Sequence, residues 1–245
     1  MGRDGSVRIG CTGWAIPTGS AEAFPAVGSH LARYAGRLAA VEISSSFYRH
    51  HRPATYARWA ATVPPGFRFA VKLPRAVTHD ARLGPDGLPA LDRFLAEAAQ
   101  LGDRLGPLLA QLPPSLAIDA TRATAFFAAL AARTPAALAC EQRHPSWFTG
   151  AGDALLAGLH VARVAADPAI VPAAGRPGGW DGLAYYRLHG SPTLYRSPYA
   201  DAARADLAGV LRREAAAPVW CCFDNTAAGA APHDALALAA LLGRP

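Results

Sequence analysis

The stretch Pro135-Ala136-Ala137-Leu138-Ala139-Cys140-Glu141-Gln142-Arg143-His144 passes directly from apolar residues to a carboxylate, a guanidinium and an imidazole. Its apolar part predicts a buried strand over residues 136–141. In parallel α/β proteins, ligands bind beyond the carboxyl ends of the strands. The stretch therefore predicts a parallel sheet and, at the end of this strand, part of a functional site.

The same succession recurs along the chain. Strands are expected over residues 7–11, 38–43, 67–72, 105–112, 136–141, 161–167, 183–188 and 218–223. Helices are expected over 21–37, with breaks at Pro25 and Gly28, and over 53–61, 91–101, 120–132 (capped by Asp119), 151–159, 201–216 and 227–242. Residues 73–89 are expected to form a loop, and residues 168–181 show no helical period.

Eight strands that alternate with helices predict an α/β fold, a (β/α)8 TIM-like barrel. It is expected to be a single domain over residues 1–245, with a reduced helix between the sixth and seventh strands. The alternative is an open doubly wound sheet, which no glycine-rich nucleotide-binding motif supports.

Alternation along the strands predicts which side chains face the helices and which face the barrel interior. Large side chains are expected beneath the helices: Val41, Ile43, Phe67, Phe69 and Tyr186. Small side chains are expected inside, together with polar residues: Ala40, Ala70, Ala139 and Ala165.

Charge and cysteine content narrow the class of protein. The formal net charge of +6 favours anionic partners, nucleic acid among them. The four cysteines form no C-x-x-C pair and fall in expected strands, so we expect reduced thiols and a cytoplasmic protein. Residues 1–6 are polar and predict no signal peptide; they fit the myristoylation pattern, although the bacterial type of composition argues against it. No apolar run is long enough to cross a membrane.

Polar residues at the strand ends would converge at the mouth, the end of the barrel at which its strands terminate. The candidates at strand ends are Glu42, Ser44, Lys72, Gln111, Glu141, Arg143, Asp167, Arg187, His189 and Asn225. His79 lies in an expected mouth loop, and Trp14, Tyr48 and Trp147 are expected to wall the pocket. Lys72 is the only lysine in the chain, and its position at a strand end favours a functional role over chance.

Three chemistries can use these residues. Glu42 and Glu141 are candidates for general acid and base, with Lys72 and His189 as further catalytic candidates. Lys72, Arg143, Arg187 and the histidines could hold an anion, and Lys72 could instead form a Schiff base if burial lowers its pKa. Carboxylates and histidines from separate strands could bind a metal ion, but no H-x-H or H-E-x-x-H spacing indicates one, so no metal site and no cofactor is assigned.

The chain also resembles a known family through blocks that occur in order along nearly its whole length. They are Ile9-Gly10-Cys11-Thr12-Gly13-Trp14, Val41-Glu42-Ile43-Ser44-Ser45-Ser46-Phe47-Tyr48, Val71-Lys72, Thr78-His79, Leu105-Gly106-Pro107, Gln111-Leu112-Pro113-Pro114, Glu141-Gln142-Arg143-His144, Ser146-Trp147, Tyr186-Arg187-Leu188-His189-Gly190 and Phe223-Asp224-Asn225. These blocks resemble the YecE-like family, domain of unknown function 72. The resemblance implies a TIM-like barrel and no particular activity; such barrels have been likened to metal-dependent endonucleases and sugar isomerases. The chain departs from the family at Ser44-Ser45, where Asn is usual first, and at Asp224, which replaces an Asn.

The leading hypothesis is an enzyme that acts on a small anionic or polyol-like substrate at the mouth by acid/base chemistry. Lys72, Arg143, Arg187 and His189 would bind or polarise the substrate, and Asn225 would orient it. The alternative is a nucleic-acid-binding or metal-dependent phosphodiester-processing barrel, and a small-ligand sensor is a third possibility. The sequence assigns no oligomeric state.

Overall fold

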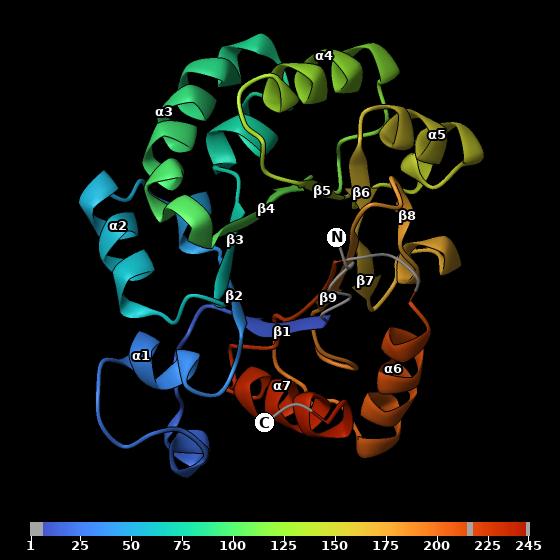
Figure 1. The fold of residues 1–245 in the computed structure, drawn as a ribbon. Coiled ribbons are helices and arrows are strands. Elements are labelled where there is room, and N and C mark those ends of the chain that lie inside the picture. Colours follow the sequence, from blue (N-terminus) through green and yellow to red (C-terminus); the bar gives the residue numbers. More distant parts are fainter. Residues whose placement is uncertain (1–6, 215–217, 244–245) are drawn as a thin grey trace, which may run out of the picture.

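The computed structural model describes residues 7–214 and 218–243, and there a ring of helices surrounds an inner sheet (Figure 1). The strands are β1 (Val7–Thr12), β2 (Ala40–Ile43), β3 (Arg68–Lys72), β4 (Leu105–Gln111), β5 (Leu138–Glu141), β6 (Val161–Arg163), β7 (Ala165–Asp167), β8 (Gly178–Gly179), β9 (Ala184–Leu188) and β10 (Val219–Phe223). The α-helices are α1 (His30–Ala35), α2 (Pro53–Thr62), α3 (Leu88–Ala98), α4 (Ala120–Ala131), α5 (Gly150–Gly158), α6 (Asp201–Arg213) and α7 (Ala231–Leu241). Short 3₁₀ or π turns are η1 (Thr18–Ala23), η2 (Ser45–Phe47), η3 (Ala76–Asp80), η4 (Pro85–Gly87), η5 (Ala99–Arg104), η6 (Pro145–Trp147) and η7 (Pro172–Gly175).

The sheet closes into a barrel because residues 161–167 pair with a different neighbouring strand at each end of the segment. Its strands lie in the order β7-β9-β10-β1-β2-β3-β4-β5-β6-β8. β6 pairs with β5 and β7 pairs with β9, and Val164 alone separates β6 from β7. The single strand expected over 161–167 is therefore two, since the strands of a barrel are staggered and meet each neighbour over a different part of their length. The predicted TIM-like barrel is confirmed.

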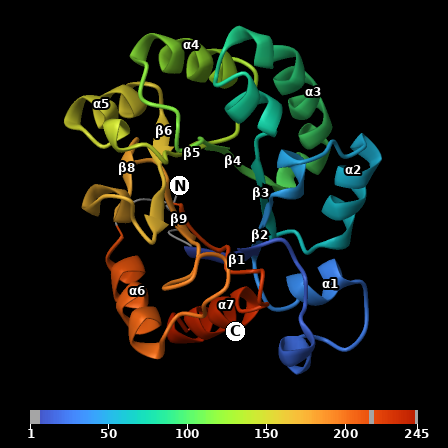
Figure 2. The same ribbon diagram turned by 180° about the vertical axis from the view of Figure 1, so that it is seen from behind.

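The helices match the expected series with local differences. In place of a helix, η7 and β8 connect β7 to β9, as the missing period over 168–181 predicted (Figure 2). Helix α3 begins at Leu88, earlier than expected, because Pro89 fits the first turn of a helix, where no N–H partner is needed. The expected loop over 73–89 contains η3 and η4. The expectations for residues 1–6 and for Ala216 lie outside the described residues.

The breaks expected at Pro25 and Gly28 are confirmed: α1 begins only after Ser29, whose side chain accepts a hydrogen bond from the backbone N–H of Ala32. The cap predicted at Asp119 is confirmed as well, since its side chain accepts from the N–H of Arg122. Such caps satisfy N–H groups that the first turn of a helix leaves unpaired.

Two apolar clusters fill the fold. The outer cluster lies between sheet and helices and contains all five large side chains predicted there, Val41, Ile43, Phe67, Phe69 and Tyr186. The inner cluster consists of Ala40, Ala70, Leu109, Ala139, Ala162, Val164, Leu183, Tyr185, Trp220 and Cys222. The inward placement of Ala165 was wrong: it belongs to the outer cluster, because it lies two pleats beyond Val161, which also packs outward.

Small inner residues leave room for two stacked aromatic rings. The rings of Tyr185 and Trp220 lie with their centroids 6.0 Å apart and their planes 5° from parallel. They plug the barrel interior, and the hydroxyl of Tyr185 donates to Glu42 Oε2 at 2.9 Å. An apolar floor thus supports a polar layer at the mouth.

Candidate functional site

A cluster of charged side chains is buried at the mouth, with Arg187 at its centre. Arg187 follows Tyr185 by two residues along β9, so both side chains face the barrel interior. Its guanidinium contacts three carboxylates: Glu42 from β2, Glu141 from β5 and Asp224 just beyond β10. The mouth cluster, as we call it, consists of Glu42, Glu141, Arg143, Arg187, His189 and Asp224.

Glu42 is fully engaged within this cluster. Arg187 donates to both of its oxygens, from Nη2 to Oε1 at 2.8 Å and from Nε to Oε2 at 2.9 Å. Ser44 donates to Oε1 at 2.6 Å and Tyr185 to Oε2 at 2.9 Å. The carboxylate is completely buried. It therefore fixes the guanidinium and has little capacity left to accept from a ligand.

His189 joins the other two carboxylates. Its Nδ1 lies 3.0 Å from Asp224 Oδ2, and its Nε2 lies 3.0 Å from Glu141 Oε1. Arg187 Nη1 and Arg143 Nε each donate to Glu141 at 2.5 Å. With a carboxylate at each ring nitrogen, the imidazolium form can donate two hydrogen bonds at once.

The pKa values of these groups follow from this arrangement. Burial alone would raise the pKa of Glu141, but Arg187, His189 and Arg143 hold it well below its usual value. Burial would likewise raise the pKa of Asp224, and Arg187 with the His189 hydrogen bond keeps it low. Burial would lower the pKa of His189, but the charge of Glu141 and the hydrogen bonds to both carboxylates raise it above the ordinary value. The cluster is thus a set of ion pairs.

A pH dependence of stability follows for His189. A histidine with a raised folded pKa stabilises fully below its unfolded pKa, about 6.5, and loses that contribution as the pH rises through the folded value. Glu141 and Asp224 attract its charge, Arg187 and Arg143 repel it, and the Tyr195 ring packs edge-on to it.

We therefore expect the stability difference between the wild type and His189→Gln to shrink as the pH rises from about 5.5 to 7.5. Urea unfolding of both proteins at each pH measures this difference. Parallel curves across the range would contradict the assignment of a charged His189.

Lys72 lies beside the cluster with a different environment. It ends β3, and its Nζ lies 4.0 Å from the centroid of the Phe47 ring. His79 packs edge-on against the same ring at 4.9 Å, and its Nδ1 lies 2.9 Å from Thr78 Oγ1. Burial, then Arg187, lower the pKa of Lys72 to about 8, against the attraction of the cluster carboxylates. Lys72 therefore loses its proton more readily than an ordinary lysine.

The cluster carboxylates do not form a metal site as they are arranged. The Arg187 guanidinium occupies the position between Glu42, Glu141 and Asp224 that a bridging cation would need. Within residues 7–214 and 218–243, no three His, Cys, Asp or Glu side chains are placed to hold a metal ion.

Of the remaining predicted site residues, Gln111 lies at the mouth, whereas Asp167 and Asn225 do not. Gln111 is the register partner of Glu141 and shares the inward face of β4 with Leu109. Asp167 accepts from the Tyr199 hydroxyl at 2.9 Å and lines a cavity of about 190 Å³ toward α6. Asn225 is buried and donates to Asp234 on α7 at 2.7 Å.

The three aromatic residues expected as pocket walls have separate surroundings. Trp14 packs against Trp59 and Phe69 on the outer side of the sheet. Trp147 is buried in the outer cluster, and Tyr48 is 78% exposed. The structure does not bring these three rings together.

Sequence reasoning left out three residues that contact or adjoin the cluster. Asp224 had a detectable signal, since it continues the inward alternation of β10 from Cys222. Phe47, whose ring contacts Lys72 Nζ, had no detectable sequence signal, because it lies in a turn without periodicity. Thr12 ends β1 opposite Glu42 in register, and its buried hydroxyl finds no hydrogen-bonding partner within the described part of the chain.

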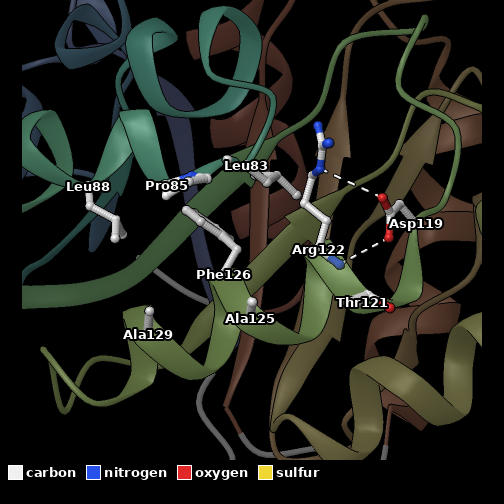
Figure 3. Close-up of a pocket in the computed structure, with 10 residues that line it drawn as sticks. Leu83, Pro85, Leu88, Asp119, Thr121, Arg122, Ala125, Phe126 and Ala129 are labelled. Atoms are coloured by element: carbon white, nitrogen blue, oxygen red, sulfur yellow. Dashed lines mark hydrogen bonds and ion pairs between the residues drawn. The ribbon is translucent and has the colours of Figure 1, made fainter.

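A groove of about 410 Å³ lies away from the cluster, between α4 and residues 83–88 (Figure 3). Its lining is mainly apolar, with Leu83, Leu88 and Phe126 as large members. Its charged residues, Asp119 and Arg122, are already paired at the start of α4. Because both charged side chains of the groove are engaged with each other, we place the candidate site at the mouth.

Comparison with solved structures supports the barrel. A DUF72 family protein from Enterococcus faecalis V583 matches with a TM-score of 0.78 and 19% identity, covering 98% of this chain and 96% of that one. A DUF72 family protein from Thermotoga maritima MSB8 matches with a TM-score of 0.76 and 22% identity, covering 97% and 99%. D-psicose 3-epimerase from Clostridium cellulolyticum H10, solved with D-tagatose, is more distant, with a TM-score of 0.57, 10% identity and coverage of 88% and 93%. At these identities the likeness concerns the fold.

No helix among the described residues has the length and apolar character needed to span a bilayer.

Two further comparisons concern the family of the chain. No curated protein matches the chain. The family model described as "Protein of unknown function DUF72" matches residues 8–245. The chain therefore belongs to the DUF72 family.

Proposed function

We propose that this protein is an enzyme that acts on a small anionic or polyol-like molecule at the barrel mouth by acid/base chemistry. The observation that carries the proposal is the mouth cluster, in which side chains from separate strand ends form a buried ionic network around Arg187. Buried charge of this kind is costly to maintain, and strongly perturbed pKa values concentrate at functional sites.

The contacts within the mouth cluster support different roles for its glutamates, for His189 and for Lys72. Glu42 and Glu141, the acid/base pair expected from sequence, are both held by Arg187, and the low pKa of Glu141 makes it a weak proton acceptor. We therefore assign proton transfer to His189 and Lys72, and to the two glutamates the positioning of Arg187 and His189.

Arg143 is the cation best placed to receive an anion. Its Nε and Nη2 contact Glu141 and His189, while no hydrogen bond joins its Nη1 to a described residue. Its side chain is 16% exposed, against 1% for Arg187. Guanidinium groups suit carboxylate and phosphate oxygens. Gln111, His79 and Thr12 would then contact polar groups of the substrate, and the sugar bound by the distant epimerase barrel agrees with a polyol-like substrate.

The test is a thermal-shift screen with phosphate, small carboxylates, sugars and a short oligonucleotide. We expect small anions to raise the melting temperature of the wild type, and Arg143→Ala to lose most of that shift. Arg133→Ala is the matched control, because it removes an arginine paired with a carboxylate, Asp92, on another part of the surface.

Equal shifts in the wild type and Arg143→Ala would contradict the proposal. Stabilisation by the oligonucleotide alone, falling steeply with salt, would favour the alternative of a nucleic-acid-binding or phosphodiester-processing barrel.

A further inference from the structure

Lys72 differs from every other cation at the mouth. Arg143, Arg187 and His189 each lie within 3.0 Å of a carboxylate oxygen. No hydrogen bond or salt bridge joins Lys72 Nζ to any described residue, although the side chain is only 8% exposed. An ammonium carries three N–H donors, and burying them unpaired is costly. The surroundings of Lys72 therefore favour the neutral amine.

The charges of the mouth cluster also favour the neutral amine of Lys72. The carboxylates of Glu42, Glu141 and Asp224 are balanced by Arg143, Arg187 and the imidazolium of His189. The cluster thus needs no further positive charge from Lys72. Contact with the Phe47 ring removes water from one side of the amine. A desolvated, unpaired lysine next to a cationic group is the environment that makes an amine nucleophilic.

We propose that Lys72 Nζ captures the carbonyl carbon of a small anionic aldehyde or ketone as a Schiff base. This inference rests on the proposed function and narrows its substrate to carbonyl compounds. Arg143 Nη1 would bind the carboxylate or phosphate of that substrate, because Nε donates to Glu141 and Nη2 lies against His189, whereas no hydrogen bond joins Nη1 to a described residue.

The reaction balances without an oxidant or reductant. The lone pair of the neutral amine forms a bond to the carbonyl carbon, and the C=O π electrons move to oxygen, which takes a proton. The nitrogen then loses one proton, which gives a carbinolamine. Its hydroxyl group takes a second proton and leaves as water while the nitrogen lone pair forms the C=N bond, and the nitrogen releases its remaining proton. The net change is amine plus carbonyl to imine plus water. His189 is the acid that the cluster holds for the oxygen, and the carboxylates that attract a charge on Lys72 would also stabilise a protonated imine.

The composition of the chain makes the test specific. Lys72 is the only lysine, so the only other primary amine of the polypeptide is its amino terminus. Glyoxylate, pyruvate and dihydroxyacetone phosphate serve as anionic probes, and dihydroxyacetone as the neutral one. Each is incubated with the full chain and sodium cyanoborohydride near neutral pH, and the adducts are located by peptide mass spectrometry.

We expect an adduct at Lys72 whose rate saturates with an anionic probe and exceeds that of the amino terminus by at least about tenfold, since a positioned amine reacts faster than a free one. Dihydroxyacetone should react more slowly, Arg143→Ala should slow the anionic probes, and Lys72→Arg should be labelled only at the amino terminus. Labelling of the wild type at the amino terminus alone, or at equal rates for all probes, would overturn the inference.

The two proposals fail in different ways. If the anionic probes stabilise the wild type and Lys72→Met alike in thermal shift, and no adduct forms at Lys72, the Schiff base is refuted and the proposed binding site stands. If Lys72 is labelled but no anion stabilises the protein in an Arg143-dependent manner, the proposed function fails as stated. Circular dichroism of each variant confirms that it is folded.

Discussion

Arg187→Met is expected to lower the free energy of unfolding by about 3 to 5 kcal/mol, the usual cost of removing one partner from a buried ion pair. The guanidinium is 1% exposed and contacts Glu42, Glu141 and Asp224. Methionine fills much of the volume but leaves these three carboxylates facing one another. Urea denaturation near neutral pH measures the loss.

Two further measurements distinguish a loss of ionic contacts in Arg187→Met from a loss of packing. Without Arg187 the buried carboxylates bind protons more tightly than in the unfolded chain, so the variant should recover stability as the pH falls toward about 5. Adding Glu42→Gln to Arg187→Met should restore part of the stability, because the two residues interact directly.

Arg133→Ala breaks the exposed pair with Asp92 and should cost less than about 1 kcal/mol. A loss in Arg187→Met no larger than in this control would show that the mouth cluster contributes little to stability.

The barrel and the strand-end residues could be predicted because both depend on local pattern. Alternation along single strands places Glu42, Lys72, Glu141 and Arg187 on the inward face without knowledge of their partners. The same rule, counted from Val161, would have placed Ala165 and Asp167 outward, where the structure has them.

The ionic partnerships could not be predicted from local pattern. Arg187 and Glu42 are 145 residues apart in sequence, and their contact exists only because the barrel closes. Closure also decides that Arg187 pairs with both glutamates, and Lys72 Nζ has no hydrogen bond or salt bridge to a described residue. The chemistry of the mouth thus depends on how charges are shared among strands, whereas the sequence shows only which charges are present.

Loop residues gave the least reliable signal, and Trp147 is the clearest example. Proximity to the polar stretch at 141–144 suggested a pocket wall. The structure buries its ring in the outer cluster, 1% exposed, and its Nε1 donates to the carbonyl oxygen of Leu116 at 2.9 Å. No period marks a residue in a turn as facing the core or the mouth, so only packing distinguishes the two.

Trp147→Ala is therefore expected to cost about 3 to 5 kcal/mol of unfolding free energy, as for other buried large aromatic residues. Trp147→Phe should cost less, because it keeps most of the apolar volume and chiefly leaves the Leu116 carbonyl without its donor, a loss of about 1 to 3 kcal/mol. Tyr48→Ala, at an exposed ring from the same set of predicted wall residues, should change stability by no more than about 0.5 kcal/mol. Urea denaturation gives all three values.

The same variants decide what Trp147 does at the mouth. If the ring is a core residue, Trp147→Phe remains folded and retains the wild-type thermal shift with small anions, because within the described residues no hydrogen bond or ring contact joins Trp147 to the mouth cluster. If the ring lined the substrate site, that shift would fall while stability changed little. A large stability loss in Trp147→Ala and retained ligand binding in Trp147→Phe must therefore be observed together. A side chain that packs against the outer face of the sheet cannot also contact a molecule bound at the inner ends of the strands.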